Sequence, residues 1–211
     1  MLRYIYATDL HQFPKLARTM FEDRADQFKT RLGWDVRLDA NGHERDDYDD
    51  LNPLYVIWEE PDGSHGGSMR FLPTTGRTMV NEHFADILSG PITSPFIWEC
   101  TRFCLSRGAG RHVAAALTLA GGEIMRNFNV DHFVGVFDPR MTRIYRLIGV
   151  TPEVLGSTGT GRDQISVGLW HYQGGAAAQV TARAGVSMTQ SAEWFARSFG
   201  QHTHAPVSLS A

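Results

Sequence analysis

Apolar residues along the chain fall into short runs that predict β-strands. The stretches Leu54–Glu60 and Asp131–Phe137 are rich in β-branched and aromatic residues and are bounded by proline, glycine or polar residues, as strands usually are. Asp131–Phe137 is apolar enough to lie in the interior of a sheet. The same criteria predict strands at Leu2–Tyr6, Gly66–Pro73, Trp98–Cys104, Thr151–Leu155 and Gln164–Tyr172.

Between these runs, apolar residues recur every three or four positions, which predicts amphipathic helices. Asp9 is a candidate N-cap for a helix from Leu10 to Phe28, and Pro139 starts a helix that ends before Gly149. The other predicted helices are Val80–Leu88, Gly110–Phe128 and Ser187–Phe199. This alternation predicts an α/β fold, in which a central mixed sheet carries helices on both faces.

The composition fits one globular domain followed by a tail. Of the 211 residues, 42% are hydrophobic and 20% are charged, so the chain can bury a full core. The domain is predicted to span residues 1–172. Residues 173–211 are predicted to be a tail with a small-residue linker at 174–178 and the last helix. The net charge of −3 gives no reason to expect general nucleic-acid binding.

The cysteines and the apolar stretches argue against several other classes of protein. Cys100 and Cys104 lie in one predicted strand, about 13 Å apart, which is too far for a disulfide. No Cys or His cluster has metal-ligand spacing. No N-terminal stretch resembles a signal peptide, and no stretch is long and apolar enough to span a membrane. We therefore expect a soluble cytoplasmic protein without a metal site.

The strand Trp98–Cys104 contains two charges, Glu99 and Arg102, which are costly to bury unless they pair or bind a polar ligand. Taken alone, a structural ion pair explains them. The two-residue period of a strand places Glu99 and Arg102 on opposite faces. If both serve one site, the strand must contain a β-bulge between them.

A polar segment from Lys29 to Asn52 contains an acidic run at residues 44–50. An irregular segment of this length is uncommon inside a domain unless it is a binding loop or a lid. Trp34 and Tyr48 within it are residues of a type that is usually buried. We therefore expect the segment to pack onto the rest of the domain.

Charged and aromatic residues between positions 24 and 102 form a pattern of their own: Arg24, Phe28, Trp34, Asp46, Asp49, Arg70, Phe84, Glu99 and Arg102. The sequences ERDDYDD at 44–50, MRFLPTT at 69–75 and WECTRF at 98–103 contain several of them. In order and spacing, this set resembles the invariant pattern of the acyl-homoserine-lactone (autoinducer) synthases. Each motif is weak alone, but together they are specific.

The resemblance implies a fold and a reaction. The fold would be a three-layer α-β-α arrangement similar to the N-acetyltransferases, with a V-shaped gap between strands for the pantetheine arm of an acyl donor. The amine of S-adenosylmethionine would be acylated, and lactonisation would then release methylthioadenosine. S-adenosylmethionine would be a substrate, so no cofactor is expected.

The resemblance, combined with side-chain chemistry, assigns residue roles. Glu99 is the candidate general base for the amine. The catalytic candidates are Glu99, Arg102, Asp46, Asp49 and Arg70, whose ion pairs would close the acidic loop over the substrate. Thr101 is expected beside the reacting carbonyl. The candidate S-adenosylmethionine-binding residues are Arg24, Phe28, Trp34, Phe84, Thr101 and Phe103.

The acyl chain is expected between the long helix and the strand that follows it. Its candidate pocket residues are Met125, Phe128, Phe137, Met141, Tyr145 and Leu169. Arg140, Arg143 and Arg146 lie near one side of a helix and form a candidate docking patch for an acidic acyl carrier protein or for coenzyme A. The length and substitution of the acyl chain, the identity of the donor and the oligomeric state stay open.

Two other functions fit parts of the sequence. An N-acyltransferase of the acetyltransferase-like fold that uses another amine would explain the fold and the turn RGAG at 107–110. It would leave Arg24, Trp34, Asp46 and Asp49 unexplained. The second alternative is a non-catalytic sensor that binds S-adenosylmethionine or an acyl lactone.

Overall fold

A mixed sheet of seven strands forms the centre of the computed structural model, which describes residues 1–171 and 174–200. The strand order is β1-β2-β3-β4-β5-β7-β6, and neighbouring strands are antiparallel except for β4 and β5, which are parallel. The predicted mixed sheet is confirmed. Its strands are β1 (Leu2–Tyr6), β2 (Leu54–Glu59), β3 (His65–Pro73), β4 (Ile97–Leu105), β5 (His132–Phe137), β6 (Glu153–Thr158) and β7 (Ile165–His171).

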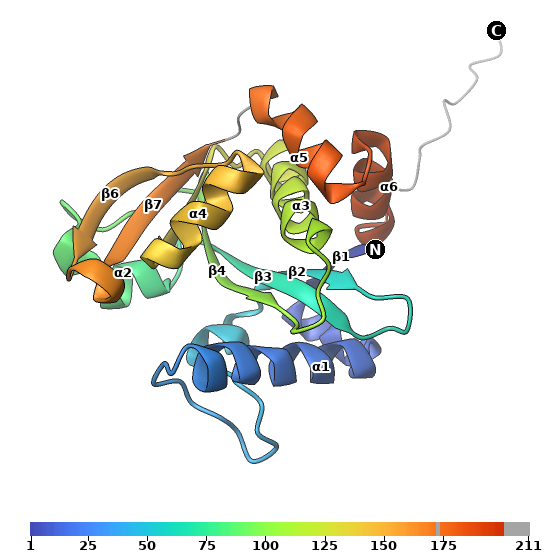
Figure 1. The fold of residues 1–211 in the computed structure, drawn as a ribbon, viewed down its shortest axis with the longest axis horizontal. Coiled ribbons are helices and arrows are strands. Elements are labelled where there is room, and N and C mark those ends of the chain that lie inside the picture. Colours follow the sequence, from blue (N-terminus) through green and yellow to red (C-terminus); the bar gives the residue numbers. More distant parts are fainter. Residues whose placement is uncertain (172–173, 201–211) are drawn as a thin grey trace, which may run out of the picture.

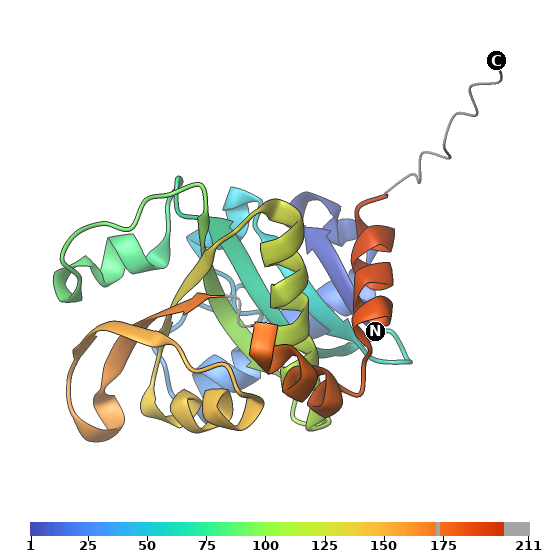
Figure 2. The ribbon, with the colours of Figure 1, turned by 90° about the horizontal axis from the view of Figure 1, so that it is seen from above.

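Helices cover both faces of the sheet, so the predicted three-layer arrangement is also confirmed. The helices are α1 (Pro14–Arg24), α2 (Met79–His83), α3 (His112–Phe128), α4 (Pro139–Ile148), α5 (Ala177–Ala184) and α6 (Met188–Ser198). α1 lies on one face of the sheet, whereas α3, α5 and α6 lie together on the other (Figures 1 and 2). Within the described ranges, no helix combines the length and apolarity that crossing a membrane requires.

Side chains of β2 alternate between two hydrophobic cores. Leu54 and Val56 pack on the side of α3, whereas Tyr55 and Ile57 pack on the side of α1. All four are buried, as expected for a strand covered on both faces. α6, the helix predicted at residues 187–199, contributes Phe195 to the α3 side. The last helix is therefore part of the core.

The first helix begins later and continues further than the sequence predicted. Ala7–Gln12 forms a 3₁₀ turn and Asp9 does not cap the helix, which begins at Pro14. Proline suits the first turn because its missing N–H has no partner to lose there. After Arg24 the backbone continues as a π-helix over Ala25–Arg31. Such widened turns are rare and are often found at functional sites.

Two boundaries predicted in the last third of the chain are wrong. β6 spans Glu153–Thr158, so Gly156 lies inside a strand rather than in a loop. A Cβ at Gly156 would lie 2.0 Å from the carbonyl oxygen of Ile87, so only glycine permits this contact. The linker predicted at 174–178 includes the start of α5, because a run of small residues has no apolar period to mark a helix. The predicted strand end at Tyr172 lies outside the described residues.

β4 and β5 separate after a short paired region, and this separation opens the sheet. Parallel pairing joins residues 97–99 of β4 to residues 132–134 of β5. Beyond it, β4 stays with β3 and β5 stays with β7. Gly135 lies at the point of separation, where a Cβ would be 2.8 Å from the carbonyl oxygen of Cys100. The sheet therefore has the gap between strands that the family resemblance implies.

Candidate active site

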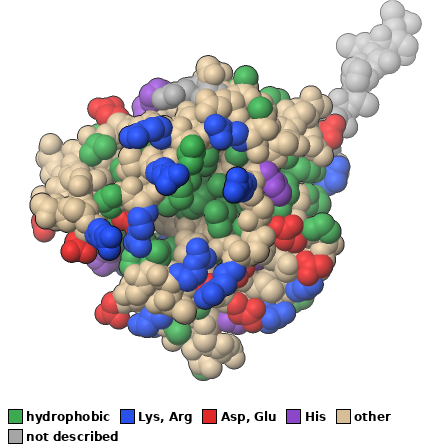
Figure 3. All heavy atoms as spheres, in the orientation of Figure 1, with side chains coloured by type: hydrophobic (Ala, Val, Ile, Leu, Met, Phe, Trp, Pro, Cys, Tyr) green, Lys and Arg blue, Asp and Glu red, His purple; other side chains and the backbone are tan. Residues whose placement is uncertain are grey.

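A cavity of about 870 Å³ passes through the sheet where β4 and β5 separate. Its first arm lies on the face of α1 and α2 and includes Phe28 and Phe84. Its second arm lies on the face of α3 and α4 and includes Met125 and Phe137. In the orientation of Figure 1, Lys and Arg side chains surround a hollow with a hydrophobic floor (Figure 3). The cavity thus connects the two faces of the sheet.

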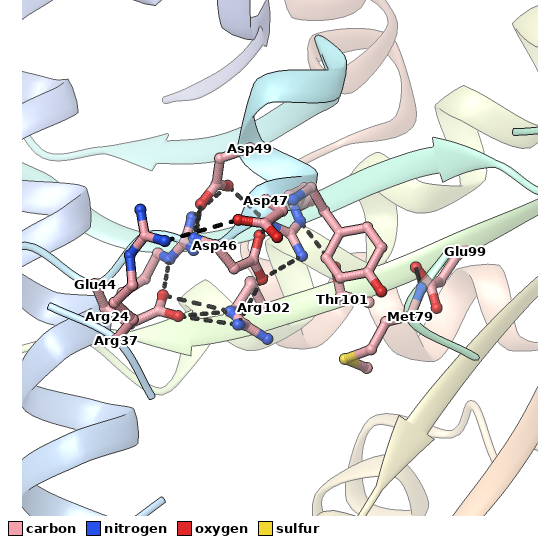
Figure 4. Close-up of polar contacts among 12 residues, drawn as sticks. Arg24, Arg37, Glu44, Asp46, Asp47, Asp49, Met79, Glu99, Thr101 and Arg102 are labelled. Carbon is pink, nitrogen blue, oxygen red and sulfur yellow. Dashed lines mark hydrogen bonds and ion pairs between the residues drawn. The ribbon is translucent and has the colours of Figure 1, made fainter. Parts of the chain in front are cut away.

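Three arginines and three acids form a closed ring of ion pairs beside the first arm (Figure 4). Charges alternate round this ring, so each member contacts two members of opposite sign. The contacts are Arg24–Glu44 (2.6 Å), Glu44–Arg102 (2.9 Å), Arg102–Asp46 (2.6 Å), Asp46–Arg70 (3.0 Å), Arg70–Asp49 (2.8 Å) and Asp49–Arg24 (2.9 Å). The structure brings the charge cluster together and adds Glu44, which the acidic run did not distinguish.

Burial makes the ring members depend on one another. Arg24, Glu44 and Arg70 are at most 1% exposed, and buried charges persist only when they are paired. Burial opposes ionisation of Asp49, but Arg24 and Arg70 outweigh it and hold the pKa of that carboxyl far below its usual value. This stabilisation is complete above the usual aspartate pKa of 3.8 and is lost as the pH falls below it.

Within the described chain, no cluster of His, Cys, Asp and Glu could hold a metal ion.

Asp46 and Asp49 also build the turn on which they lie. The Asp46 carboxylate accepts a hydrogen bond from the Tyr48 N–H (3.0 Å), and the Asp49 carboxylate accepts one from the Asp46 N–H (2.9 Å). These bonds form a capping box for the 3₁₀ turn Asp47–Leu51. Tyr55 of β2 donates its hydroxyl to Asp49 (2.6 Å). The acidic run is therefore a structured turn attached to the sheet.

β4 contains the bulge that a shared site for Glu99 and Arg102 requires. Arg70 of β3 faces Thr101, and Ser68 faces Cys104, so β4 has one extra residue over this interval. Arg102 has a φ of +52°, in the left-handed region that residues other than glycine rarely occupy. The bulge places the Arg102 guanidinium in the ring. A bulge is therefore present, but it lies at Arg102, between Thr101 and Cys104, rather than between Glu99 and Arg102 as predicted.

Gln27 holds the bulged part of β4, a role that no motif in the sequence indicated. Its amide N–H donates to the Phe103 carbonyl (2.9 Å), and its amide oxygen accepts from the Leu105 N–H (3.0 Å). Arg31, one turn further along the π-helix, donates to the Leu105 carbonyl (3.4 Å). Pairing with β5 ends at Glu99, so Gln27 takes the place of a neighbouring strand. A glutamine inside a helical pattern gives no sequence signal for this role.

The wall of the first arm is aromatic and presents one pair of opposite charges. Phe28 and Trp34 stack with their ring centroids 5.2 Å apart, and the Arg102 guanidinium lies 5.4 Å from the Phe28 centroid. Of the six ring members, Asp46 and Arg102 line the cavity. Arg24, which the sequence analysis assigned to substrate binding, is 1% exposed and contacts the other ring members instead.

Thr101 lies on the cavity wall with its hydroxyl oriented by the protein. Its oxygen accepts a hydrogen bond from Nε of Arg70 (3.0 Å), so its proton is available to a ligand. The other residues of the predicted S-adenosylmethionine set that line the cavity are Phe28, Trp34, Phe84 and Phe103.

Glu99 is buried behind α2 rather than on the cavity wall. Its carboxylate accepts hydrogen bonds from the N–H groups of Val80 (2.6 Å) and Met79 (3.1 Å). Glu99 and Met79 lie side by side in Figure 4, and Met79 lines the cavity. Burial raises the pKa of the Glu99 carboxyl, although these two hydrogen bonds oppose the shift. Each carboxylate oxygen keeps a second lone pair, so Glu99 can still accept a proton.

The second arm is mainly apolar. Four of the six residues predicted for the acyl pocket line it, namely Met125, Phe137, Met141 and Tyr145. Leu169 does not, because alternation on β7 turns it to the other face, against Val134. Its neighbour Trp170 lines the cavity in its place. Phe128 also lies elsewhere, because the end of α3 packs it against Trp98.

The three arginines of α4 differ in their surroundings. Arg140 lines the cavity and pairs with Asp138 (2.5 Å), whose carboxylate also caps the helix by accepting the Arg140 N–H (2.8 Å). Arg143 and Arg146 are exposed and form no ion pair with any residue in the described ranges. Two of the three therefore present uncompensated positive charge.

Known proteins with similar sequences share one description. The sequence profile of the autoinducer synthase family matches residues 9–173. An acyl-homoserine-lactone synthase from Rhizobium etli is 38% identical over 178 residues, which cover 81% of this chain and 84% of the relative. Another from Agrobacterium fabrum is 32% identical over 155 residues, which cover 69% of this chain and 73% of the relative.

Solved structures with similar folds include acyl-homoserine lactone synthases and an N-acyltransferase. The CoA-dependent acyl-homoserine lactone synthase BjaI, solved with SAM and isopentyl-CoA, has a TM-score of 0.75 at 22% identity and covers 88% of this chain and 89% of its own. LasI has a TM-score of 0.74 at 22% identity, and the match covers 86% of this chain and 94% of LasI. An acyl-CoA N-acyltransferase from Pseudomonas aeruginosa has a TM-score of 0.52 at 13% identity, and the match covers 79% of this chain and 97% of that protein. At these identities the likeness establishes the fold, which is similar to the N-acetyltransferases.

Replacing one buried ring member should destabilise the protein strongly. Arg24→Met leaves Glu44 and Asp49 with one arginine each, so we expect a loss of about 3–5 kcal/mol in the free energy of unfolding. The matched control is Arg18→Met, which removes the exposed pair with Glu22 and should change stability by less than about 0.5 kcal/mol. Urea unfolding measures both. Equal effects of the two substitutions would show that the ring is not a stabilising unit.

Proposed function

Because this chain belongs to the autoinducer synthase family, it is an acyl-homoserine-lactone synthase, and we propose how its cavity carries out the reaction. The enzyme transfers an acyl group from a thioester to the amine of S-adenosylmethionine, and lactonisation releases methylthioadenosine. The observation that supports the division of roles is a cavity with a charged aromatic arm on one face of the sheet and an apolar arm on the other.

In this proposal the first arm binds the methionine part of S-adenosylmethionine. Asp46 and Arg102 face this arm with opposite charges, which complement the ammonium and carboxylate of an amino acid. Phe28 and Trp34 offer aromatic faces to the sulfonium. The ring fixes both charges before the substrate arrives, so binding costs less ordering of side chains.

The second arm holds the acyl chain, and the two substrates react where the arms meet. The Thr101 hydroxyl donates a hydrogen bond to the thioester carbonyl oxygen as negative charge develops there. The neutral amine forms a bond to the carbonyl carbon, the C–S bond breaks and the thiolate leaves. The substrate carboxylate then attacks the γ-carbon of the methionine part. The bond from that carbon to the sulfonium breaks, and methylthioadenosine departs.

Glu99 is the proposed acceptor of the amine proton. Its carboxylate is held by α2 beside Met79 of the cavity wall, so the proton reaches it through a water molecule. A raised pKa makes Glu99 a better proton acceptor than an exposed glutamate. The reaction then needs no cofactor, because S-adenosylmethionine is consumed as a substrate. We place the enzyme in the cytoplasm, where both substrates are made.

The function is tested by mixing the purified protein with S-adenosylmethionine and an acyl thioester. We expect N-acyl-homoserine lactone and methylthioadenosine in equal amounts, measured by mass spectrometry. Acylation of another amine without methylthioadenosine would indicate a different N-acyltransferase. Binding without turnover of any thioester would indicate a sensor.

The donor that we propose is an acyl carrier protein. Arg143 and Arg146 are exposed on the helix whose Arg140 lines the cavity, and they form a positive patch on a chain of net charge −3. Such a patch steers an acidic carrier protein toward the cavity. BjaI is described as CoA-dependent, but at 22% identity its likeness to this chain concerns the fold alone. A coenzyme A thioester is therefore the alternative.

Gln27 is the proposed positioning residue for the acyl thioester. It holds the Phe103 carbonyl and the Leu105 N–H on the edge of β4 that faces the gap. Without it, the Phe103 carbonyl and the Leu105 N–H would have no partner, because pairing with β5 ends at Glu99, and such unsatisfied backbone groups would draw the strand out of position. Gln27 therefore maintains the width of the gap that the thioester occupies.

Glu99→Gln should reduce kcat by about 10²–10⁴-fold and leave the KM for S-adenosylmethionine nearly unchanged. In the wild type, kcat should fall as the pH drops through the raised pKa of Glu99, at a higher pH than the usual glutamate value of 4.5. That acidic limb should be absent from the variant. Kinetics across pH measure both, with thermal unfolding to verify that α2 stays folded. A variant as active as the wild type would reduce Glu99 to a structural role.

Gln27→Met, which keeps the side-chain length without the hydrogen bonds, should raise the KM for the acyl donor about tenfold and change the KM for S-adenosylmethionine less than twofold. In Gln27→Glu, protonation of the carboxyl gives it an O–H that can donate to the Phe103 carbonyl. Activity relative to the wild type should therefore increase as the pH falls. Gln179→Met is the control, because Gln179 also donates to a carbonyl, that of Leu147 (3.3 Å), but on the exposed surface. Equal changes in both KM values would contradict a role in positioning the donor.

Arg143→Glu should raise the KM for an acyl chain on carrier protein and make that KM less sensitive to salt. The effect on the same chain linked to coenzyme A should be smaller, because coenzyme A makes only local phosphate contacts. Arg197→Glu on α6 provides the same charge change away from the cavity. A salt series with both donors measures these effects. Turnover with the coenzyme A thioester alone would refute the carrier protein, and unchanged KM values for both donors would refute the patch.

A further inference from the structure

The wall of the apolar arm includes a tyrosine hydroxyl whose hydrogen bonding is not satisfied by the protein. Neighbouring polar groups of the wall are engaged: the Thr118 hydroxyl donates to the Ala114 carbonyl (3.0 Å), the Trp170 N–H donates to the Val150 carbonyl (2.9 Å), and the Cys100 thiol contacts the Met69 sulfur (3.8 Å). Tyr145 lines the same arm. Its hydroxyl forms no hydrogen bond with any residue in the part of the chain that the structure describes.

Aromatic contacts fix the position of Tyr145. Its ring packs edge-to-face against Trp170, with centroids 5.1 Å apart, and against Phe137, with centroids 5.6 Å apart. Burial raises the pKa of the Tyr145 phenol, and the nearby Cys100 and Asp138 raise it further. The phenol therefore stays protonated, and its O–H is a hydrogen-bond donor throughout the working pH range.

Tyr145 lies near the point at which the acyl chain enters the second arm. Trp170, its neighbour, approaches Gly135 closely, because a Cβ on Gly135 would be 3.4 Å from the Trp170 ring. The same Cβ would be 2.8 Å from the Cys100 carbonyl at the separation of β4 and β5. One aromatic ring thus separates Tyr145 from the junction of the two arms. We therefore infer that the chain carbons closest to the thioester lie beside Tyr145.

We propose that Tyr145 selects an acyl chain that carries an oxygen substituent, hydroxyl or keto, on a carbon close to the thioester. This inference rests on the proposed placement of the acyl chain in the second arm. The Tyr145 hydroxyl lies on the cavity wall without a protein partner, and a ligand oxygen that accepts its hydrogen bond gains affinity over an unsubstituted chain. Sites that hydrogen-bond a substrate group discriminate against analogues that lack it more strongly than apolar pockets discriminate by size.

The test compares octanoyl, 3-hydroxyoctanoyl and 3-oxooctanoyl thioesters on one carrier, with the wild type and with Tyr145→Phe. We expect the wild type to prefer at least one oxygenated chain about tenfold in kcat/KM. Tyr145→Phe should lose that preference, because its kcat/KM for the oxygenated chain should fall more than its kcat/KM for octanoyl thioester. Comparison of the two oxygenated donors shows whether Tyr145 selects the hydroxyl or the keto form. Thr118→Val is the matched control, because its hydroxyl lines the same arm but is bound to the backbone.

Several results would overturn the proposal. A wild type without any preference among the three chains would do so, and this measurement requires no variant to fold. A preference that persists in Tyr145→Phe would assign the selection to another group. An equal loss for all three chains would reduce Tyr145 to a packing role, and loss of preference in Thr118→Val would point to the general polarity of the arm. Absence of methylthioadenosine release with every donor would instead count against the reaction itself.

Discussion

The closed ring of three arginines and three acids is the interaction on which the site depends. It joins α1, the acidic turn, β3 and β4, four segments that are far apart in the sequence. Four of the six members are buried and the charges alternate, so the loss of one member leaves two neighbours partly unpaired. Two members, Asp46 and Arg102, also face the cavity. The ring therefore couples the stability of the fold to the charges offered to a substrate.

The separation of β4 and β5 opens the cavity that Asp46 and Arg102 of the ring face. A continuous sheet would divide the charged arm from the apolar arm, but the gap lets one cavity pass between them. Opening a sheet leaves backbone groups without partners. Gln27 satisfies two of these on β4, and Gly135 permits the close approach to Cys100 where the strands part. The structure thus supports an opening that strand pairing alone would close.

Placement of the acyl chain shows how a small difference in register changes a site. Sequence periodicity assigned the second arm to the correct helices and strands, and four of its six candidates line the cavity. Leu169 was assigned to the wrong face because the register of β7 was unknown, and a shift of one residue reverses every side chain of a strand. Trp170, on the correct face, packs with Phe137 and Tyr145 to form the wall of the arm.

The sequence by itself determined the fold class, the order of most strands and helices, and the need for a bulge if Glu99 and Arg102 share a site. These features follow from periodicity and caps, which act over a few residues. Most members of the charge cluster were identified by the resemblance of their order and spacing to a known family. Only the tertiary structure decided that Glu44 closes the ring, that Gln27 replaces a strand, that Glu99 lies behind α2 and that Tyr145 has no partner. Each of these depends on contacts between segments distant in sequence, and such contacts are fixed by the register and packing of the folded chain.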